Sequence, residues 1–277
     1  MNLFDQTSLE CGRLITNRYS TSFSMGIRTL HPRFRLSVCG IYGFVRFADE
    51  IVDTFHEHNR ADLLARFRIE THLAIAEKIS LNPVLNAFQL TVNRYNIEAE
   101  LIDAFLDSMA TDLSRARYNA PSQYQQYIYG SAEVVGLMCL RVFCEGDNEK
   151  YEALKAPARS LGSAFQKVNF LRDMRSDYDE RGRVYFPNAD FHGFTTADKL
   201  SIEADIQKDF DDAEEGIKRL PKGARAGVYL AGIYYKQLFN KIRRMSPACI
   251  QNSRVRVPDS VKVLLLLRTW AFGLFST

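Results

Sequence analysis

The most informative stretch of the chain is residues 166–187, which read QKVNFLRDMRSDYDERGRVYFP. Polar side chains recur within it at intervals of three, four and four residues, at Gln166, Asn169, Asp173 and Asp177. Because an α-helix completes a turn in about 3.6 residues, this spacing places them on one helical face. The apolar residues Phe165, Val168 and Leu171 follow the same period beside that face. Lys and Glu would be the usual fillers of a solvent face, so this stripe of amides and carboxylates indicates a site.

A second pair of carboxylates lies in residues 46–53, RFADEIVD. Asp49 and Asp53 are four residues apart, so on a helix they share a face with roughly 6 Å of rise between them. Glu50 points about 100° away from Asp49. Alone, such a pair is usually part of a solvated face. The other stripe changes this interpretation, since two carboxylate helices that face each other repel unless cations relieve the repulsion.

Magnesium suits these residues, because it binds hard oxygen ligands, keeps several waters and takes its remaining oxygens from phosphorylated substrates. Mn²⁺ is the alternative ion. Guanidinium groups are well shaped for phosphate oxygens, and arginines accompany both stripes at Arg46, Arg172, Arg181 and Arg183. The pattern therefore predicts a site for Mg²⁺ and a diphosphate.

The rest of the chain predicts further helices. Alternating runs rich in Val, Ile and Thr, which would indicate strands, are scarce. Proline is favoured in the first turn of a helix, and we expect helices to begin at or just after Pro32, Pro83, Pro121, Pro157 and Pro258. Glycines and a proline between 182 and 193 predict a loop, followed by helices over 195–218 and 224–244. We find no repeat or linker, and predict one all-α domain over residues 1–277.

The composition excludes several classes of protein. A net charge of +3 argues against a dedicated nucleic-acid binder. Five cysteines without a C-x-x-C pair suggest neither a disulfide framework nor a zinc site, so we expect a reducing, cytoplasmic location. We see no signal peptide and no apolar run long enough to span a bilayer. The nearest run, 261–275, is interrupted by charges and fits a core helix or one that lies on the inner face of the membrane.

The pattern N-x-x-R-D-x-x-x-D-x-x-x-R-G-R-x-Y-x-P at residues 169–187 resembles the signature of the squalene and phytoene synthase family. DEIVD at 49–53 resembles the first aspartate-rich motif of that family. Residues 19–23, 112–118, 127–138 and 254–257 are similar to further family segments, in the expected order. The resemblance covers nearly the whole chain.

The resemblance implies a single-domain isoprenoid-synthase-type helical bundle with a central apolar cavity. It implies that the catalytic aspartates Asp49, Asp53, Asp173 and Asp177 hold Mg²⁺, with Asn169 and Gln166 beside them. It implies that the diphosphates are bound by Arg46, Tyr42, Arg172, Tyr235 and Arg254. It implies that the hydrocarbon channel is lined by Ser20, Phe23, Tyr129, Val135 and Gly136. Two departures are Glu50, where Asp is common, and Gly130-Ser131, where bulkier residues are common and where we expect an altered channel width.

The implied reaction is the head-to-head condensation of two geranylgeranyl diphosphates, through a cyclopropylcarbinyl (prephytoene) diphosphate, to phytoene, the first committed step of carotenoid biosynthesis. No NADPH is expected, since the chain has no Gly-rich strand–turn–helix fingerprint. The alternative is a squalene or dehydrosqualene synthase that uses two farnesyl diphosphates. A non-catalytic helical lipid-binding protein would be a different class, but such a protein has no need of four motif aspartates.

Overall fold

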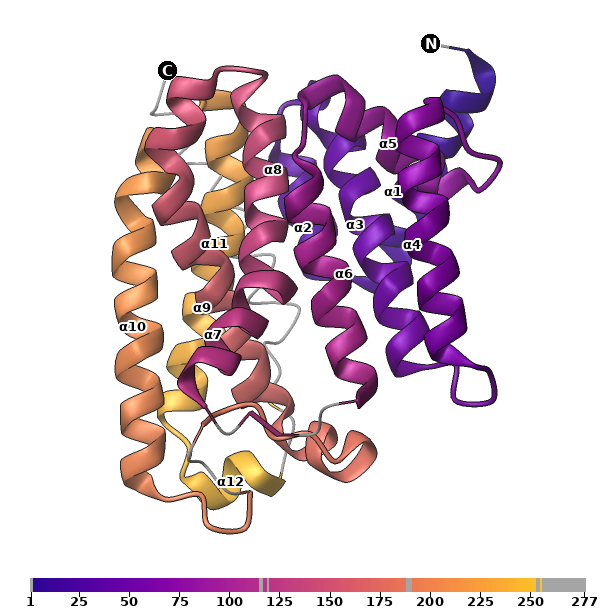
Figure 1. Ribbon diagram of the computed structural model, residues 1–277. Coiled ribbons are helices and arrows are strands. Elements are labelled where there is room, and N and C mark those ends of the chain that lie inside the picture. The colour runs from indigo at the N-terminus through magenta and orange to yellow at the C-terminus, as the bar shows by residue number, and fades with distance from the viewer. Residues whose placement is uncertain (1, 115–116, 119, 188–190, 253–254, 256–277) are drawn as a thin grey trace.

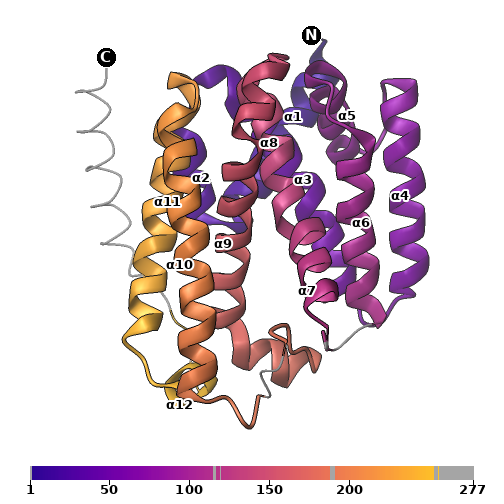
Figure 2. The ribbon, with the colours of Figure 1, turned by 60° about the vertical axis from the view of Figure 1, so that its left-hand side comes forward.

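The computed structural model describes residues 2–114, 117–118, 120–187, 191–252 and 255. Across these residues the chain forms helices and no strand, apart from an isolated bridge between Arg117 and Val184. Two groups of helices lie side by side: α9, α10 and α11 on one side and α1, α3, α4 and α5 on the other, with α8 between them (Figures 1 and 2). The prediction of an all-α, single-domain bundle is confirmed.

The first half of the bundle consists of α1 Leu3–Tyr19, α2 Thr21–Thr29, α3 Pro32–Asp53, α4 Arg60–Glu77, α5 Pro83–Tyr95 and α6 Ala99–Ser114. The second half consists of α7 Pro121–Ile128, the π-helical turn η1 Tyr129–Glu133, α8 Val134–Cys144, α9 Asn148–Arg181, α10 Thr196–Arg219, α11 Lys222–Arg243 and α12 Pro247–Asn252.

Several helices begin where the sequence predicted. Pro32, Pro83 and Pro121 each lie in the first turn of their helix, where a residue without a backbone N–H loses no intrahelical hydrogen bond. At α10, Thr195 and Asp198 form a reciprocal capping box. Gly182 ends α9 in the left-handed conformation, with φ +63°, which glycine adopts without steric cost.

The expectation that a helix begins after Pro157 is wrong, because Pro157 lies inside α9. An internal proline removes one helical hydrogen bond and clashes with the preceding turn. Packing explains why the helix continues: a Cβ added at Gly216 of α10 would lie 2.3 Å from Pro157 Cβ. The proline ring therefore fills the contact between α9 and α10. The predicted helix from Pro258 lies outside the described residues.

Two apolar clusters anchor the helices that carry the aspartates. In the first cluster, Phe44 of α3 stacks on Phe88 with ring centroids 3.9 Å apart. In the second cluster, Phe170 of α9 stacks on Tyr185 with ring centroids 3.8 Å apart. Each helix thus buries an apolar face in its own cluster, which leaves the polar stripe on a different face.

The run Pro121–Cys144 is also long and apolar enough to span a bilayer by length and composition. The sequence pointed instead to 261–275 as the nearest candidate. Its most apolar window is 61% buried inside the protein, and it packs between α6 and α9. This environment is that of a core helix.

Candidate active site

The two aspartate stripes lie on α3 and on the last turns of α9. Asp49 is one turn before the end of α3 and Asp53 is its last residue. Asp173 and Asp177 lie in the final turns of α9. Arg181 Nη1 lies 3.1 Å from Asp177 Oδ1, and its Nε lies 3.5 Å from Asp53 Oδ1. One guanidinium therefore contacts carboxylates from both helices, as expected if the stripes face each other.

Arginines balance much of the negative charge. Arg183 Nη1 donates a hydrogen bond of 2.9 Å to Asp53 Oδ1. Arg172 Nε lies 3.0 Å from both carboxylate oxygens of Asp173. On α3, Arg46 forms an ion pair with Glu50. These ion pairs relieve part of the repulsion between the carboxylates, for which the sequence also predicted Mg²⁺.

Burial raises the pKa of two motif carboxyls. The pKa of Asp49 rises to about 7, mainly through burial, while nearby Arg46 lowers it and Asp53 raises it further. Burial also raises the pKa of Asp177 to about 7, and the next largest contribution is the charge of Asp173. A bound cation favours the ionised form of such carboxyls and would lower both pKa values.

These residues fit a divalent cation that shares its shell with a substrate. Among the described residues no three Asp, Glu, His or Cys side chains lie close enough to enclose an ion unaided. Magnesium does not require such a cage, because waters and diphosphate oxygens complete its octahedron. The donors on both helices are hard carboxylate oxygens, which Mg²⁺ and Mn²⁺ prefer over softer ligands.

An aromatic row lies beside the carboxylates and joins four helices. The ring of Phe23 on α2 lies 5.9 Å from Tyr42 on α3 and 6.4 Å from Tyr235 on α11. Tyr235 stacks on Phe165 of α9, with ring centroids 4.0 Å apart. Its hydroxyl donates a hydrogen bond of 3.3 Å to Asn169 Oδ1. The row therefore places apolar surface next to the polar stripe of α9.

Two further predicted residues adjoin this row. Ser20 Oγ accepts a hydrogen bond of 3.1 Å from the Phe23 backbone, which caps α2. Ser20 also hydrogen-bonds the Tyr42 hydroxyl, whose pKa burial raises to about 12. Gln166 lies partly buried on α9, one turn before Asn169. Arg254 lies outside the described residues, and its predicted role stays a prediction.

The remaining predicted channel residues lie on η1 and α8. Tyr129 and Val135 pack partly buried against the first apolar cluster. The Arg159 guanidinium lies 5.1 Å from the centroid of the Tyr129 ring. A Cβ added at Gly136 would lie 3.1 Å from the Ala158 carbonyl oxygen, so Gly136 faces the backbone of α9. Lining of the hydrocarbon channel by these residues stays a prediction.

Gly130 is explained by a close contact with α6, while the altered channel width expected at Gly130-Ser131 stays a prediction. A Cβ at this position would lie 2.0 Å from Ser108 Oγ and 2.4 Å from the Ala104 carbonyl oxygen, both on α6. The glycine therefore permits a close contact between η1 and α6. A larger side chain here would meet α6 first.

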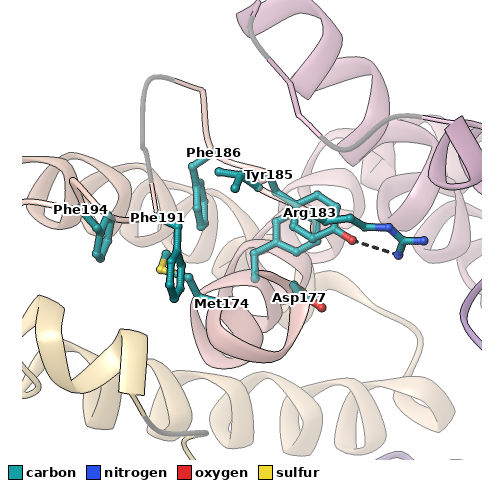
Figure 3. Close-up of a pocket in the computed structure, with 9 residues that line it drawn as sticks. Met174, Asp177, Arg183, Tyr185, Phe186, Phe191 and Phe194 are labelled. Atoms are coloured by element: carbon teal, nitrogen blue, oxygen red, sulfur yellow. Dashed lines mark hydrogen bonds between the residues drawn. The ribbon is translucent and has the colours of Figure 1, made fainter. Parts of the chain in front are cut away.

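A small apolar pocket lies behind the second stripe, between α9 and the segment that follows it (Figure 3). Its lining includes Met174, Phe186, Phe191 and Phe194, with Asp177 and Arg183 at its edge. Its volume of about 20 Å³ is room for roughly one water molecule. It is too small for an isoprenyl chain, so we interpret it as a packing void beneath the segment that carries Arg183.

Asp112 and Tyr127 are not among the site residues predicted from the sequence, although they lie close to the second stripe. Asp112 lies on α6, and its carboxylate accepts a hydrogen bond of 2.8 Å from the Tyr127 hydroxyl. Its carbonyl accepts one of 3.0 Å from Arg183, which is 71 residues away in the chain. Both residues fall within segments that resemble the family, and this was the only signal that could have found them.

A helical bundle that combines facing carboxylates, arginines suited to phosphate and an adjacent aromatic surface is the arrangement of an enzyme that binds prenyl diphosphates. The comparisons with known proteins agree. The chain belongs to the squalene/phytoene synthase family, whose model matches residues 16–260. The family resemblance inferred from the motifs is thereby confirmed.

Curated relatives are phytoene synthases. The chain is 29% identical to that of Arthrospira platensis, with 94% of this chain and 91% of the relative covered. It is 28% identical to the chloroplastic phytoene synthase of Daucus carota, with 87% of this chain covered and 64% of the relative. A solved dehydrosqualene synthase matches with a TM-score of 0.84 at 23% identity, over 99% of this chain and 98% of that one. A squalene synthase from Alicyclobacillus acidocaldarius matches with a TM-score of 0.76 at 21% identity, over 88% and 96%. These structures support the fold.

Proposed function

We propose that this protein is a phytoene synthase, which joins two geranylgeranyl diphosphates head to head in a magnesium-dependent reaction. The observation that carries the proposal is the contact of Arg181 with Asp53 and Asp177, which brings together two aspartate stripes 124 residues apart. The curated relatives favour the phytoene branch of the family over the squalene branch.

The residues divide the chemistry between two surfaces. Mg²⁺ held by the four aspartates and Asn169 would stabilise the diphosphate leaving group. Arg46 and Arg172, each beside a motif aspartate, would orient the diphosphate oxygens. Ionisation of the allylic C–O bond leaves a carbocation, and the row of Phe23, Tyr42 and Tyr235 would keep water away from it. The double bond of the second substrate attacks this cation, and loss of a proton closes the cyclopropane ring of the cyclopropylcarbinyl diphosphate. A second ionisation, rearrangement and loss of a proton complete the hydrocarbon.

The experiment is to incubate the purified protein and Mg²⁺ with geranylgeranyl or farnesyl diphosphate, with and without NADPH, and to identify the hydrocarbon. We expect phytoene from geranylgeranyl diphosphate without NADPH. A strict NADPH requirement for release of hydrocarbon, or products from farnesyl diphosphate alone, would move the protein to the squalene branch. A protein that binds these diphosphates without turning them over would be a lipid-binding protein.

We also propose that the protein is cytoplasmic and associates reversibly with the inner face of the membrane. Its substrate and product are lipids, which favours an enzyme that works at a lipid surface. Residues 261–275 combine leucines, Trp270 and Phe272 with Lys262 and Arg268. Such a segment binds anionic lipid through its apolar side chains and its positive charge.

A further inference from the structure

Helix α4 carries apolar residues on both of its faces. On the inner face Phe67 is buried, and its ring stacks on that of Phe44 in α3 with centroids 5.6 Å apart. On the outer face two large side chains one turn apart are exposed, Ile69 at 59% and Leu73 at 50%. A helix that is apolar on all sides is usually buried on all sides. We therefore expect the outer face of α4 to have a partner as well.

Contacts on its flank fix the rotation of α4 about its own axis. Arg68 Nη1 lies 3.4 Å from Asp103 Oδ1 on α6, and its Nη2 pairs with Asp107 one turn further along. His72 Nε2 lies 3.0 Å from the same Asp103 oxygen. Because these contacts and the buried inner face hold α4 in one orientation, a rotation of the helix cannot hide its outer face.

The exposed apolar surface runs the length of the outer face and continues beyond the helix. The α4 patch consists of Ala65, Ile69, Leu73, Ala76, Ile79 and Leu81, all of them exposed. Its first four members recur at intervals of four, four and three residues, which places them in one line along the helix. Helix α4 lies at the outer edge of the bundle in both views (Figures 1 and 2). Apolar residues that cluster on a surface mark an interaction site, whereas scattered ones do not.

The charges around the α4 patch favour a protein partner over a lipid surface. The exposed charged residues between 61 and 81 are Asp62, Arg66, Glu70, Glu77 and Lys78. Three negative and two positive charges give this surface a net charge of −1. Helices that lie on membranes carry mostly Lys and Arg beside their apolar face, because these residues attract anionic lipid. The α4 patch lacks that excess of positive charge.

The outer face of α4 is complementary to itself when a second copy runs antiparallel. About a two-fold axis at Thr71, a residue before the axis meets the residue equally far behind it in the other copy. Ile69 of each copy then packs on Leu73 of the other. Arg66 and Glu77 lie on the same flank, about 20° apart around the helix. Arg66 of each copy therefore approaches Glu77 of the other, and two ion pairs form.

Arg66 is free to make this contact. Within one copy its Nη1 lies 3.8 Å from Asp62 Oδ2, and more than half of each side chain is exposed. An exposed pair of this kind contributes little to stability, so Arg66 can exchange Asp62 for a carboxylate of a second copy.

We propose that the α4 patch is a dimer interface, at which two copies of this protein pair through antiparallel α4 helices. Two-fold dimers are the commonest soluble oligomers. The interface is one helix wide, which puts its area at the low end of specific interfaces, and we expect a dissociation constant on the order of 1–100 μM. The inference goes beyond the proposed function and does not rest on it, because α4 carries none of the predicted site residues.

The first test is analytical ultracentrifugation of the wild type and of Ile69→Lys from about 1 to 200 μM, a range that brackets the expected dissociation constant. The wild type should pass from monomer to dimer. Each Ile69→Lys dimer would bury two unpaired charges, so its dissociation constant should rise about a hundredfold or more. Leu200→Lys is the matched control, because Leu200 on α10 is 58% exposed and lies outside the α4 patch. It should dimerise like the wild type, and thermal unfolding checks that both variants fold.

Two charge reversals test the antiparallel arrangement. Arg66→Glu and Glu77→Arg each place like charges opposite one another twice in every dimer, and each should weaken dimerisation by about tenfold. An equal mixture of the two variants should restore it, since every such contact in a mixed dimer joins unlike charges.

Several outcomes would overturn the inference. The wild type could stay monomeric over the whole range, or Leu200→Lys could weaken the dimer as much as Ile69→Lys. A mixture of the two charge-reversal variants that dimerises no better than either alone would exclude antiparallel pairing. Vesicle binding that Ile69→Lys abolishes, without dimers in solution, would assign the α4 patch to a lipid surface. The proposed function would stand in each case, because hydrocarbon formation is assayed separately.

Discussion

Asp49 carries a cost in stability that its substitution should reveal. Burial raises the pKa of its carboxyl from 3.8 to about 7, so the ionised form is disfavoured in the folded protein. At 1.36 kcal/mol per pKa unit, the ionised Asp49 carboxyl lowers the free energy of unfolding by at most about 4 kcal/mol at a pH above both values. Because the amide of Asp49→Asn must also be desolvated, we expect a gain of about 1–3 kcal/mol in the free energy of unfolding at pH 8.

The pH dependence identifies the cause. A group whose pKa is raised on folding contributes stability that is present below its ordinary pKa and is lost as the pH rises through the folded value. The gain in the free energy of unfolding from Asp49→Asn should therefore be less than half as large at pH 5 as at pH 8. Urea denaturation of both proteins in the presence of a chelator measures this difference in stability at each pH.

The same substitution should abolish most of the activity. Removal of one electrostatic stabiliser of a developing charge commonly costs on the order of a hundredfold or more in turnover. Asp179→Asn is the control: Asp179 lies on α9 away from the stripe, and its half-exposed carboxylate pairs with Arg175 at 3.1 Å. It should change stability by less than about 1 kcal/mol and leave turnover intact. An Asp49→Asn protein no more stable than the wild type at pH 8, or equally stabilised at both pH values, would refute the reasoning.

Four further outcomes are expected. Glu50 pairs with Arg46 and is not a predicted metal ligand. Glu50→Gln should therefore lower turnover at saturating Mg²⁺ by less than roughly tenfold. A loss as large as that for Asp49→Asn would contradict a metal site built only from the face of α3 that carries Asp49 and Asp53. Since burial raises the pKa of Asp49 to about 7, protons compete with the cation, and the half-maximal Mg²⁺ concentration should rise as the pH falls from 8 to 6; a constant value would contradict this. Gly130→Ala places a Cβ 2.0 Å from Ser108 Oγ and should cost about 1–3 kcal/mol of stability by overpacking, measured by thermal unfolding; an unchanged Tm would argue against the close contact with α6. Binding to anionic vesicles should weaken as salt rises, because the segment 261–275 is basic and apolar; a protein that ignores such vesicles at low ionic strength would refute membrane association.

Local periodicity predicted much of this molecule. The polar stripe of α9 follows from spacings of three and four residues, which depend only on helical geometry. The helix starts at Pro32 and Pro83 follow from the preference of proline for the first helical turn. That the two aspartate stripes face each other around a cation could also be predicted, because acidic faces of this kind need a counter-charge. The family resemblance then supplied the chemistry that spacing alone leaves open.

Contacts between distant segments could not be predicted in this way. Arg183 reaches Asp53 across 130 residues of sequence, and no local pattern marks that contact. Pro157 was misread for a related reason: proline locally favours the first turn of a helix, but packing against Gly216 of α10 lets α9 continue through Pro157. The contact of Gly130 with α6 could not be predicted either, because no local pattern marks the helix that faces this glycine.

The central claim is that two prenyl diphosphates are both ionised at one site to give a single hydrocarbon. The most direct test is the ratio of inorganic pyrophosphate released to hydrocarbon formed, when Mg²⁺ starts the reaction of the purified protein with geranylgeranyl diphosphate. Because each ionisation releases one diphosphate, the account predicts two pyrophosphates for each phytoene. One pyrophosphate for each hydrocarbon, or pyrophosphate release without any forty-carbon product, would contradict head-to-head condensation.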